Sequence, residues 1–299
     1  MDVAIDCTYT HLILNYLSNQ GNSDKAMTDE TPVMIAVAPN GARKTRLDHP
    51  NLPLTPRELA ATAAACLAAG ACMIHLHVRD SRQRHSLDPH YYLEATSIIR
   101  GKVGSDMIIQ ITTEAVGLYT AQEQMRVVRE VRPEAVSLAI REICPPGCDE
   151  TKAAEFFAWL LQENISPQYI LYSRAEIQRF NDLKTRGIIP LQHDTILLAL
   201  GRYAENQQSN PDDLRPLLVE VSERSSWWVC AFGATESECL AHTIKAGGHC
   251  RVGFENNMLL PDGSIAPSNE ILVAQVAVNA GKHKRPVATA EIARDYMAL

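Results

Sequence analysis

The sequence predicts an α/β protein, a (β/α)8 TIM barrel preceded by an N-terminal extension. Three observations support this prediction. The chain has 299 residues, close to the roughly 250 that one such barrel needs. From residue 33 onward, short apolar runs rich in β-branched residues recur eight times. Helical patterns separate these runs, and strands that alternate with helices are typical of a parallel sheet.

The first 32 residues differ from the rest of the chain. Segments 19–24 and 28–32 have the composition of turns and loops. We therefore divide the chain into an N-terminal arm, residues 1–32, and a catalytic barrel domain, residues 33–299. The arm offers a contact for a second subunit, and we expect a homo-oligomer, either a dimer or a tetramer.

The apolar runs place the strands in order along the chain. They lie at residues 33–38, 72–78, 107–112, 135–139, 169–172, 195–200, 227–232 and 249–254. Helix starts are expected at Thr55, which is followed by a proline and by Glu58, and at Thr120 and Ser268. A doubly wound open sheet is the alternative, but no Gly-x-Gly-x-x-Gly motif follows the first strand.

Composition excludes several classes of function. The formal net charge is -7 and no basic patch stands out, so we expect no nucleic-acid partner. No apolar run reaches the roughly 18 residues that a membrane span needs. The chain starts without a basic, signal-like segment and its eight cysteines show no spacing pattern, which favours the cytoplasm.

The second strand carries two histidines at alternate positions. His75 and His77 point to the same face because side chains two apart on a strand share a side. Paired imidazoles suit a transition metal such as zinc. Two buried, hydrogen-bonded histidines are the alternative interpretation.

The last strand ends in an acid and contains an arginine. In a closed barrel this strand lies beside the first, so Glu255 is positioned to complete a set of two histidines and one glutamate. A surface glutamate at a strand end is the alternative. Arg251 is costly to bury unpaired, so we expect it to face Glu255 or an anionic ligand.

Hydroxyl and basic side chains follow other strands. Thr112 and Thr113 end the third strand and Ser137 lies in the fourth, where hydroxyls can bind a substrate carboxylate or an oxyanion; threonine is also simply a good strand former. Arg43 lies in the loop after the first strand, where it either holds an anion or is merely solvated. The pair Cys144 and Cys148 lacks further ligands at suitable spacing, and we expect a loop.

These motifs together resemble the β-keto acid cleavage enzyme family, which is typified by the 3-keto-5-aminohexanoate cleavage enzyme. The resemblance extends from residue 33 to the C-terminus. It is carried by segments 51–56, 70–80, 109–113, 132–134, 247–255 and 268–269.

The resemblance implies a zinc-dependent (β/α)8-barrel enzyme with one Zn²⁺ per chain, bound by His75, His77 and Glu255. The implied reaction is of retro-Claisen type: a β-keto acid and acetyl-CoA give acetoacetate and a new acyl-CoA. Arg251 matches the catalytic arginine of the family. Thr112 and Ser137 match positions that face the substrate.

Three positions depart from the family pattern. Asn256 replaces an aspartate that acts with the arginine in deprotonation, and an amide is no general base. Ile170 replaces a second acid. Arg43 replaces a glutamate that meets a substrate amino group, and an arginine there suits an anionic substrate tail.

Three functions remain open at this stage. The first is the family reaction, with proton transfer moved to another group or to water. The second is a metal-dependent lyase or hydrolase without CoA chemistry. The third is a catalytically impaired, ligand-binding paralogue.

Overall fold

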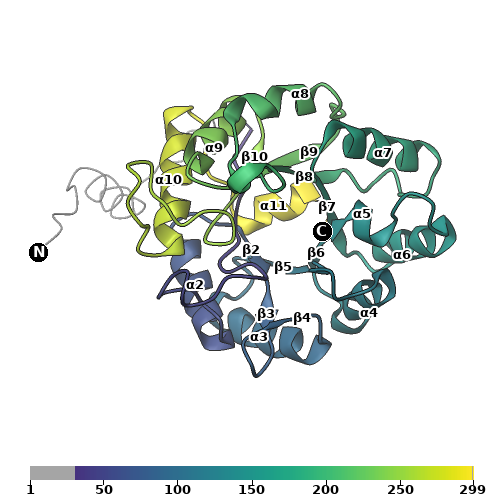
Figure 1. The fold of residues 1–299 in the computed structure, drawn as a ribbon, viewed down its shortest axis with the longest axis horizontal. Helices are drawn as coiled ribbons and strands as arrows, with labels where there is room; N and C mark the ends of the chain where they lie inside the picture. Colours follow the sequence, from purple (N-terminus) through teal and green to yellow (C-terminus); the bar gives the residue numbers. More distant parts are fainter. Residues whose placement is uncertain (1–30, 298) are drawn as a thin grey trace, which may run out of the picture.

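The computed structural model describes residues 31–297 and residue 299. The predicted arm therefore lies almost wholly outside the described residues. Eight parallel strands form a closed barrel in the order β1, β10, β9, β8, β7, β6, β5, β2, and helices surround it (Figure 1). The (β/α)8 barrel predicted from the sequence is confirmed.

The elements alternate along the chain as expected. The barrel strands are β1 (Ile35–Val37), β2 (Met73–Leu76), β5 (Ile108–Thr112), β6 (Ala135–Ala139), β7 (Ser166–Leu171), β8 (Thr195–Leu200), β9 (Ser226–Ala231) and β10 (His249–Val252). A small hairpin follows β2 and consists of β3 (Val78–Arg79) and β4 (His85–Ser86). The helices are α2 (Pro56–Ala68), α3 (Pro89–Val103), α4 (Ala121–Val131), α5 (Ile140–Ile143), α6 (Glu150–Gln162), α7 (Arg174–Thr185), α8 (Leu214–Leu218), α9 (Glu236–Lys245), α10 (Asn269–Lys282) and α11 (Ala290–Met297). None of these helices is both long and apolar enough to cross a membrane.

Two predicted helix starts have the expected caps. Thr55 accepts a hydrogen bond from the Glu58 backbone, and the Glu58 carboxylate accepts one from the Thr55 N–H. Thr120 and Glu123 form the same reciprocal pair at α4. These reciprocal pairs, called capping boxes, provide hydrogen-bond acceptors for backbone N–H groups that have no partner within the first helical turn.

Strand bounds differ from the predictions mainly at β7. That strand begins at Ser166, three residues before the predicted start, and includes Pro167, which pairs with Val136 of β6. Proline lacks the N–H that a central strand uses, so the sequence signal there is weak. The first and last strands are shorter than predicted.

Alternation along the strands produces two hydrophobic layers. One fills the space between the strands and the surrounding helices. The other includes Ala36, Met73 and Trp228 and fills the barrel interior. Helix α11 packs Ala293 and Met297 against this interior cluster and lies across the barrel in Figure 1. It closes the amino ends of the strands, so the carboxyl ends are left for ligands.

Closure of the barrel joins the first and last strands. Ala36 of β1 lies opposite Arg251 of β10. Asn269, at the start of α10, secures the ends of both strands: its Nδ2 donates to the Pro39 carbonyl at 3.1 Å and its Oδ1 accepts from the Phe254 N–H at 2.9 Å. Gly253 has a φ of +137°, and a Cβ there would lie 2.5 Å from the Ala38 carbonyl oxygen.

We expect Gly253→Ala to lower the free energy of unfolding by about 1–3 kcal/mol through backbone strain alone, with an additional cost from the clash. Gly101→Ala is the control, because Gly101 lies in α3 and a Cβ added there would meet nothing within 4 Å; it should be neutral or stabilising by up to about 1 kcal/mol. Thermal unfolding measures both variants. Equal melting temperatures for Gly253→Ala and the wild type would contradict the prediction.

Candidate active site

A cavity of about 290 Å³ opens at the carboxyl ends of the barrel strands. Its apolar wall includes Ile170, Ala199 and Phe232. Its polar lining consists of Arg43, Lys44, Asp48, His75, Thr112, Glu114, Tyr172, Arg202, Gln207, Arg251 and Glu255. The cavity therefore combines charged side chains with an apolar wall, as ligand sites do.

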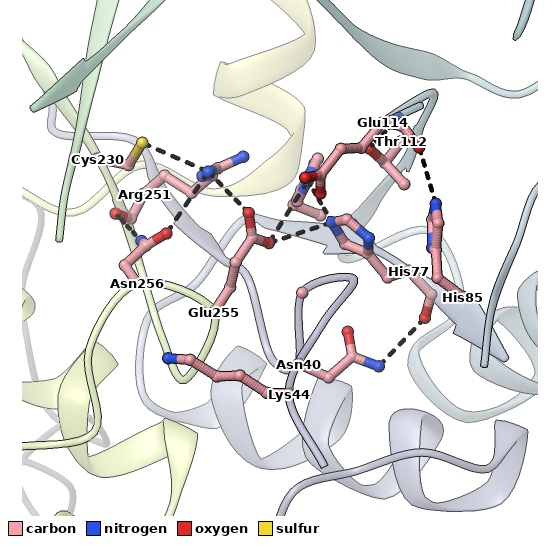
Figure 2. Close-up of polar contacts among 12 residues, drawn as sticks. Asn40, Lys44, His77, His85, Thr112, Glu114, Cys230, Arg251, Glu255 and Asn256 are labelled. Carbon is pink, nitrogen blue, oxygen red and sulfur yellow. Dashed lines mark hydrogen bonds and ion pairs between the residues drawn. The ribbon is translucent and has the colours of Figure 1, made fainter. Parts of the chain in front are cut away.

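Two imidazoles and a carboxylate converge at this cavity. His75 and His77 are buried, and their Nε2 atoms lie 3.2 Å apart. The Oε2 atom of Glu255 lies 3.2 Å from His77 Nε2 and 3.7 Å from His75 Nε2. Figure 2 shows His77 and Glu255 facing each other. In the part of the chain that the structure describes, these three residues form the one cluster with metal-ligand character.

The hydrogen bonding of His75 fits metal binding. Its Nδ1 lies 2.8 Å from the Gln110 side-chain oxygen, which can only accept, so Nδ1 carries the proton and Nε2 keeps a free lone pair. Burial and the neighbouring Arg251 lower the pKa of His75 to about 3, which keeps the ring neutral. Such support from a residue behind the ligand is typical of metal-binding histidines.

The donor set as a whole therefore fits a divalent metal. Two neutral imidazole nitrogens and one carboxylate oxygen are the ligands of zinc sites that keep a position open for substrate. Gly41, at a φ of +60°, allows Glu255 to approach, since a Cβ there would lie 2.7 Å from Glu255 Cγ.

Arg251 is buried beside this cluster. Its Nη2 donates to Glu255 Oε1 at 3.1 Å, to Cys230 Sγ at 3.3 Å and to Asn256 Oδ1 at 3.5 Å (Figure 2). Its Nε and Nη1 have no hydrogen-bond partner among the described residues. Arginine keeps its charge under these conditions, so Arg251, which lines the cavity, places a positive charge beside any anionic or carbonyl oxygen bound there.

Asn256 lies behind Arg251 and outside the cavity lining. Its Nδ2 donates to the Arg251 carbonyl at 3.2 Å and to Glu236 Oε1 at 3.4 Å. Burial raises the pKa of Glu236 to about 8, while hydrogen bonds from Asn257 and Asn256 oppose that shift. No sequence motif drew attention to Glu236, because it lies at the start of α9, far along the chain from His75 and His77.

Three cationic side chains line the outer part of the cavity. Arg43 and Arg202 both lie near the Glu114 carboxylate, at 2.5 Å and 3.6 Å. Lys44 donates to the Phe254 carbonyl at 2.5 Å, and burial lowers its pKa. Sequence reasoning identified Arg43 but missed Lys44 as a separate feature and missed Arg202, which enters the site only through the loop after β8.

The predicted hydroxyl residues occupy different positions. Thr112 lines the cavity, and its Oγ1 accepts from the Glu114 N–H at 3.0 Å. Thr113 is buried outside the cavity lining and donates to the Ser137 carbonyl at 3.0 Å. The Ser137 hydroxyl is buried, and no partner for it is found within the described ranges. Of the three, Thr112 is thus the one that the cavity exposes to a ligand.

Other candidates prove structural. The His85 Nε2 lies 2.8 Å from the Glu114 carbonyl oxygen, and its ring lies 5.3 Å from that of His77; it supports the ligand histidine without sharing the cluster. The Sγ atoms of Cys144 and Cys148 are 3.7 Å apart, and no third ligand joins them in the described region. This agrees with the loop expected from the sequence.

Comparison with known proteins identifies relatives. Residues 32–299 match a family model described as beta-keto acid cleavage enzyme. The chain is 30% identical over 275 residues to the 3-keto-5-aminohexanoate cleavage enzyme of Fusobacterium nucleatum, covering 89% of this chain and 98% of that one. It is 27% identical over 279 residues to the 3-oxoadipate:acetyl-CoA acetyltransferase of Cupriavidus necator, and the match covers 90% of this chain and 95% of that one. The solved structure of ObcA with oxaloacetate has the same fold, with a TM-score of 0.67 at 17% identity over 84% of this chain and 68% of that one.

We expect the purified protein to bind about one divalent ion per chain and to lose it in His77→Ala and Glu255→Gln, because each removes a ligand. Gln110→Ala should weaken metal affinity roughly 10–100-fold by releasing the His75 ring. Elemental analysis and titration calorimetry measure stoichiometry and affinity. His90→Ala, a change at an exposed position, is the control; equal loss of metal in this variant would argue against the assigned site.

Proposed function

The chain belongs to the beta-keto acid cleavage enzyme family, and we propose that it is a zinc-dependent enzyme that converts a β-keto acid and acetyl-CoA into acetoacetate and a new acyl-CoA. The observation that carries this proposal is the convergence of His75, His77 and Glu255, in a cluster that meets a cavity lined by His75, Glu255 and Arg251. The names of the relatives, a cleavage enzyme and an acetyl-CoA acetyltransferase, support the reaction class.

Each site residue has a role that its surroundings support. Zinc held by His75, His77 and Glu255 would act as a Lewis acid toward the keto oxygen and carboxylate of the substrate. The unpaired N–H groups of Arg251 stabilise negative charge as it develops on a substrate oxygen. The Thr112 hydroxyl contacts the substrate from the cavity wall.

The remaining predicted site residues act indirectly. Asn256 holds Arg251 through its side-chain oxygen and, as an amide, takes no proton. Ile170 contributes an apolar wall where an acid would serve as a base. The proton is therefore transferred by another cavity group or by water. Thr113 and Ser137 support the strand ends that carry Thr112.

The substrate is an anionic keto acid with a second negative group. Arg43, Lys44 and Arg202 outnumber the acids Asp48 and Glu114 in the outer cavity. An arginine pair around one carboxylate leaves positive charge for a substrate tail. The relative that acts on 3-oxoadipate handles a dicarboxylic keto acid by name.

We also propose a cytoplasmic homo-oligomer. The seven cysteines in the described part of the chain are free thiols, as in a reducing compartment. Large apolar side chains lie on the surface, among them Leu47, which is 99% exposed, and Leu118. Exposed apolar groups of this kind suit contact with a second subunit.

The decisive experiment incubates the zinc-loaded protein with acetyl-CoA and a panel of monocarboxylic and dicarboxylic β-keto acids. Mass spectrometry should detect acetoacetate together with one new acyl-CoA. Consumption of a keto acid without acyl-CoA would favour a lyase or hydrolase without CoA chemistry. Binding without turnover would favour a catalytically impaired, ligand-binding paralogue, since neither Asn256 nor Ile170 provides an acid.

We expect Arg43→Glu to lower kcat/KM for dicarboxylic keto acids at least about tenfold, which equals about 1.4 kcal/mol, because it places a negative charge beside Glu114 where the substrate tail binds. Arg46→Glu is the matched control, since Arg46 lies in the same loop, pairs with Glu58 and does not line the cavity. Steady-state kinetics on a dicarboxylic and a monocarboxylic substrate separate weaker binding of the second carboxylate from a general loss of activity. Equal losses on both substrates would sink the anionic-tail assignment.

A further inference from the structure

Glu236 is a buried carboxylate that lies close to the site without touching the cavity. It is the first residue of α9 and only 2% exposed. Its two oxygens contact two consecutive asparagines that follow β10: Oε1 lies 3.4 Å from Asn256 Nδ2, and Oε2 lies 3.2 Å from Asn257 Nδ2. The described part of the chain places no cation in contact with it, although Lys44 is near enough to favour its ionised form electrostatically.

Both asparagine side chains are fixed by their other contacts. Asn257 Nδ2 donates to the Leu259 carbonyl at 2.7 Å, and its Oδ1 accepts from the Leu259 N–H at 2.9 Å. Asn256 Nδ2 donates to the Arg251 carbonyl, and its Oδ1 accepts from Arg251 Nη2. Each amide therefore turns its NH2 group toward position 236.

Two NH2 groups that face one side chain require two acceptor oxygens. A carboxylate provides them once it is ionised, because both of its oxygens then accept and neither donates. Burial raises the pKa of Glu236 to about 8, so the ionised form predominates above that pH. A glutamine satisfies only one amide, since its own NH2 group then faces the other donor. A buried donor left without a partner is unfavourable, so one asparagine must rotate in that case. Asn256 is the easier one to rotate because its bonds, at 3.2–3.5 Å, are longer than those of Asn257 to Leu259.

We propose that Glu236 is a positioning residue for catalysis: it holds the Asn256 amide so that its oxygen faces Arg251, and it thereby fixes the guanidinium of Arg251 beside the cavity that this residue lines. When Asn256 rotates, its NH2 group faces the guanidinium and repels it. Arg251 then shifts relative to the reacting oxygen. The catalytic part of this inference rests on the proposed function, whereas the amide orientation does not.

The test combines Glu236→Gln, Asn256→Asp and the double variant. Assayed at about pH 9, where Glu236 of the wild type is ionised, Glu236→Gln should lower kcat at least about tenfold with a smaller change in KM, because Arg251 acts on charge that develops during the reaction. Asn256→Asp alone measures the effect of an acid at the position where the family has one, an effect that two carboxylates side by side in a buried site oppose. The double variant counts as recovery only where its kcat exceeds that of both single variants. The double variant should recover at least about fivefold over Glu236→Gln, since the introduced glutamine then donates to the introduced aspartate and accepts from Asn257. Glu238→Gln, an exposed change on the same helix, is the control.

Melting temperatures are measured for every variant, so that a loss of kcat caused by loss of folded protein is recognised. A residue with a purely structural role would give no recovery of kcat in the double variant. A kcat for Glu236→Gln within twofold of the wild type, or a double variant no better than Glu236→Gln, would overturn the proposal.

A second readout separates this proposal from the proposed function. The side-chain amide resonances of Asn256, assigned by their loss in Asn256→Asp, should shift in ¹⁵N-labelled Glu236→Gln and stay in place in Glu238→Gln. If the wild type forms no acyl-CoA, the proposed function fails, and these resonances alone decide the role of Glu236. Unchanged resonances in Glu236→Gln would refute it.

Discussion

The pairing of β1 with β10 is the constraint on which the site depends. Without barrel closure, the histidines of β2 and the glutamate after β10 would lie at opposite edges of a sheet. The register that sets Ala36 beside both Met73 and Arg251 brings these segments together. Asn269 strengthens the closure by bonding to both strand ends.

Burial makes the electrostatics of the site sensitive to this geometry. Burial opposes ionisation of Glu255, but the guanidinium of Arg251 outweighs it and holds the pKa of that carboxyl well below its ordinary value. A carboxylate in this position is ionised because its neighbours are in place. A small displacement of the last strand would leave the carboxylate and the guanidinium buried and unpaired, which is strongly unfavourable.

Much of this arrangement was predictable from local patterns. Alternation along a strand placed His75 and His77 on one face, and barrel closure predicted that Glu255 would approach them; the structure brings the three together. Glu236 and Arg202 were not predictable, because their contacts depend on how the loops and α9 pack against the strand ends. Thr113 looked equivalent to Thr112 in sequence, yet alternation turns only Thr112 toward the cavity.

The loop after β1 contains, within three residues, one position that accepts no side chain and one whose side chain lines the outer cavity. Gly41 packs directly against the Glu255 side chain and tolerates no side chain of its own, whereas Arg43 extends to the half-open outer cavity. A substitution at position 43 therefore changes the charge at the mouth of the cavity and leaves Glu255 and the two histidines in place, whereas a side chain at position 41 would displace Glu255.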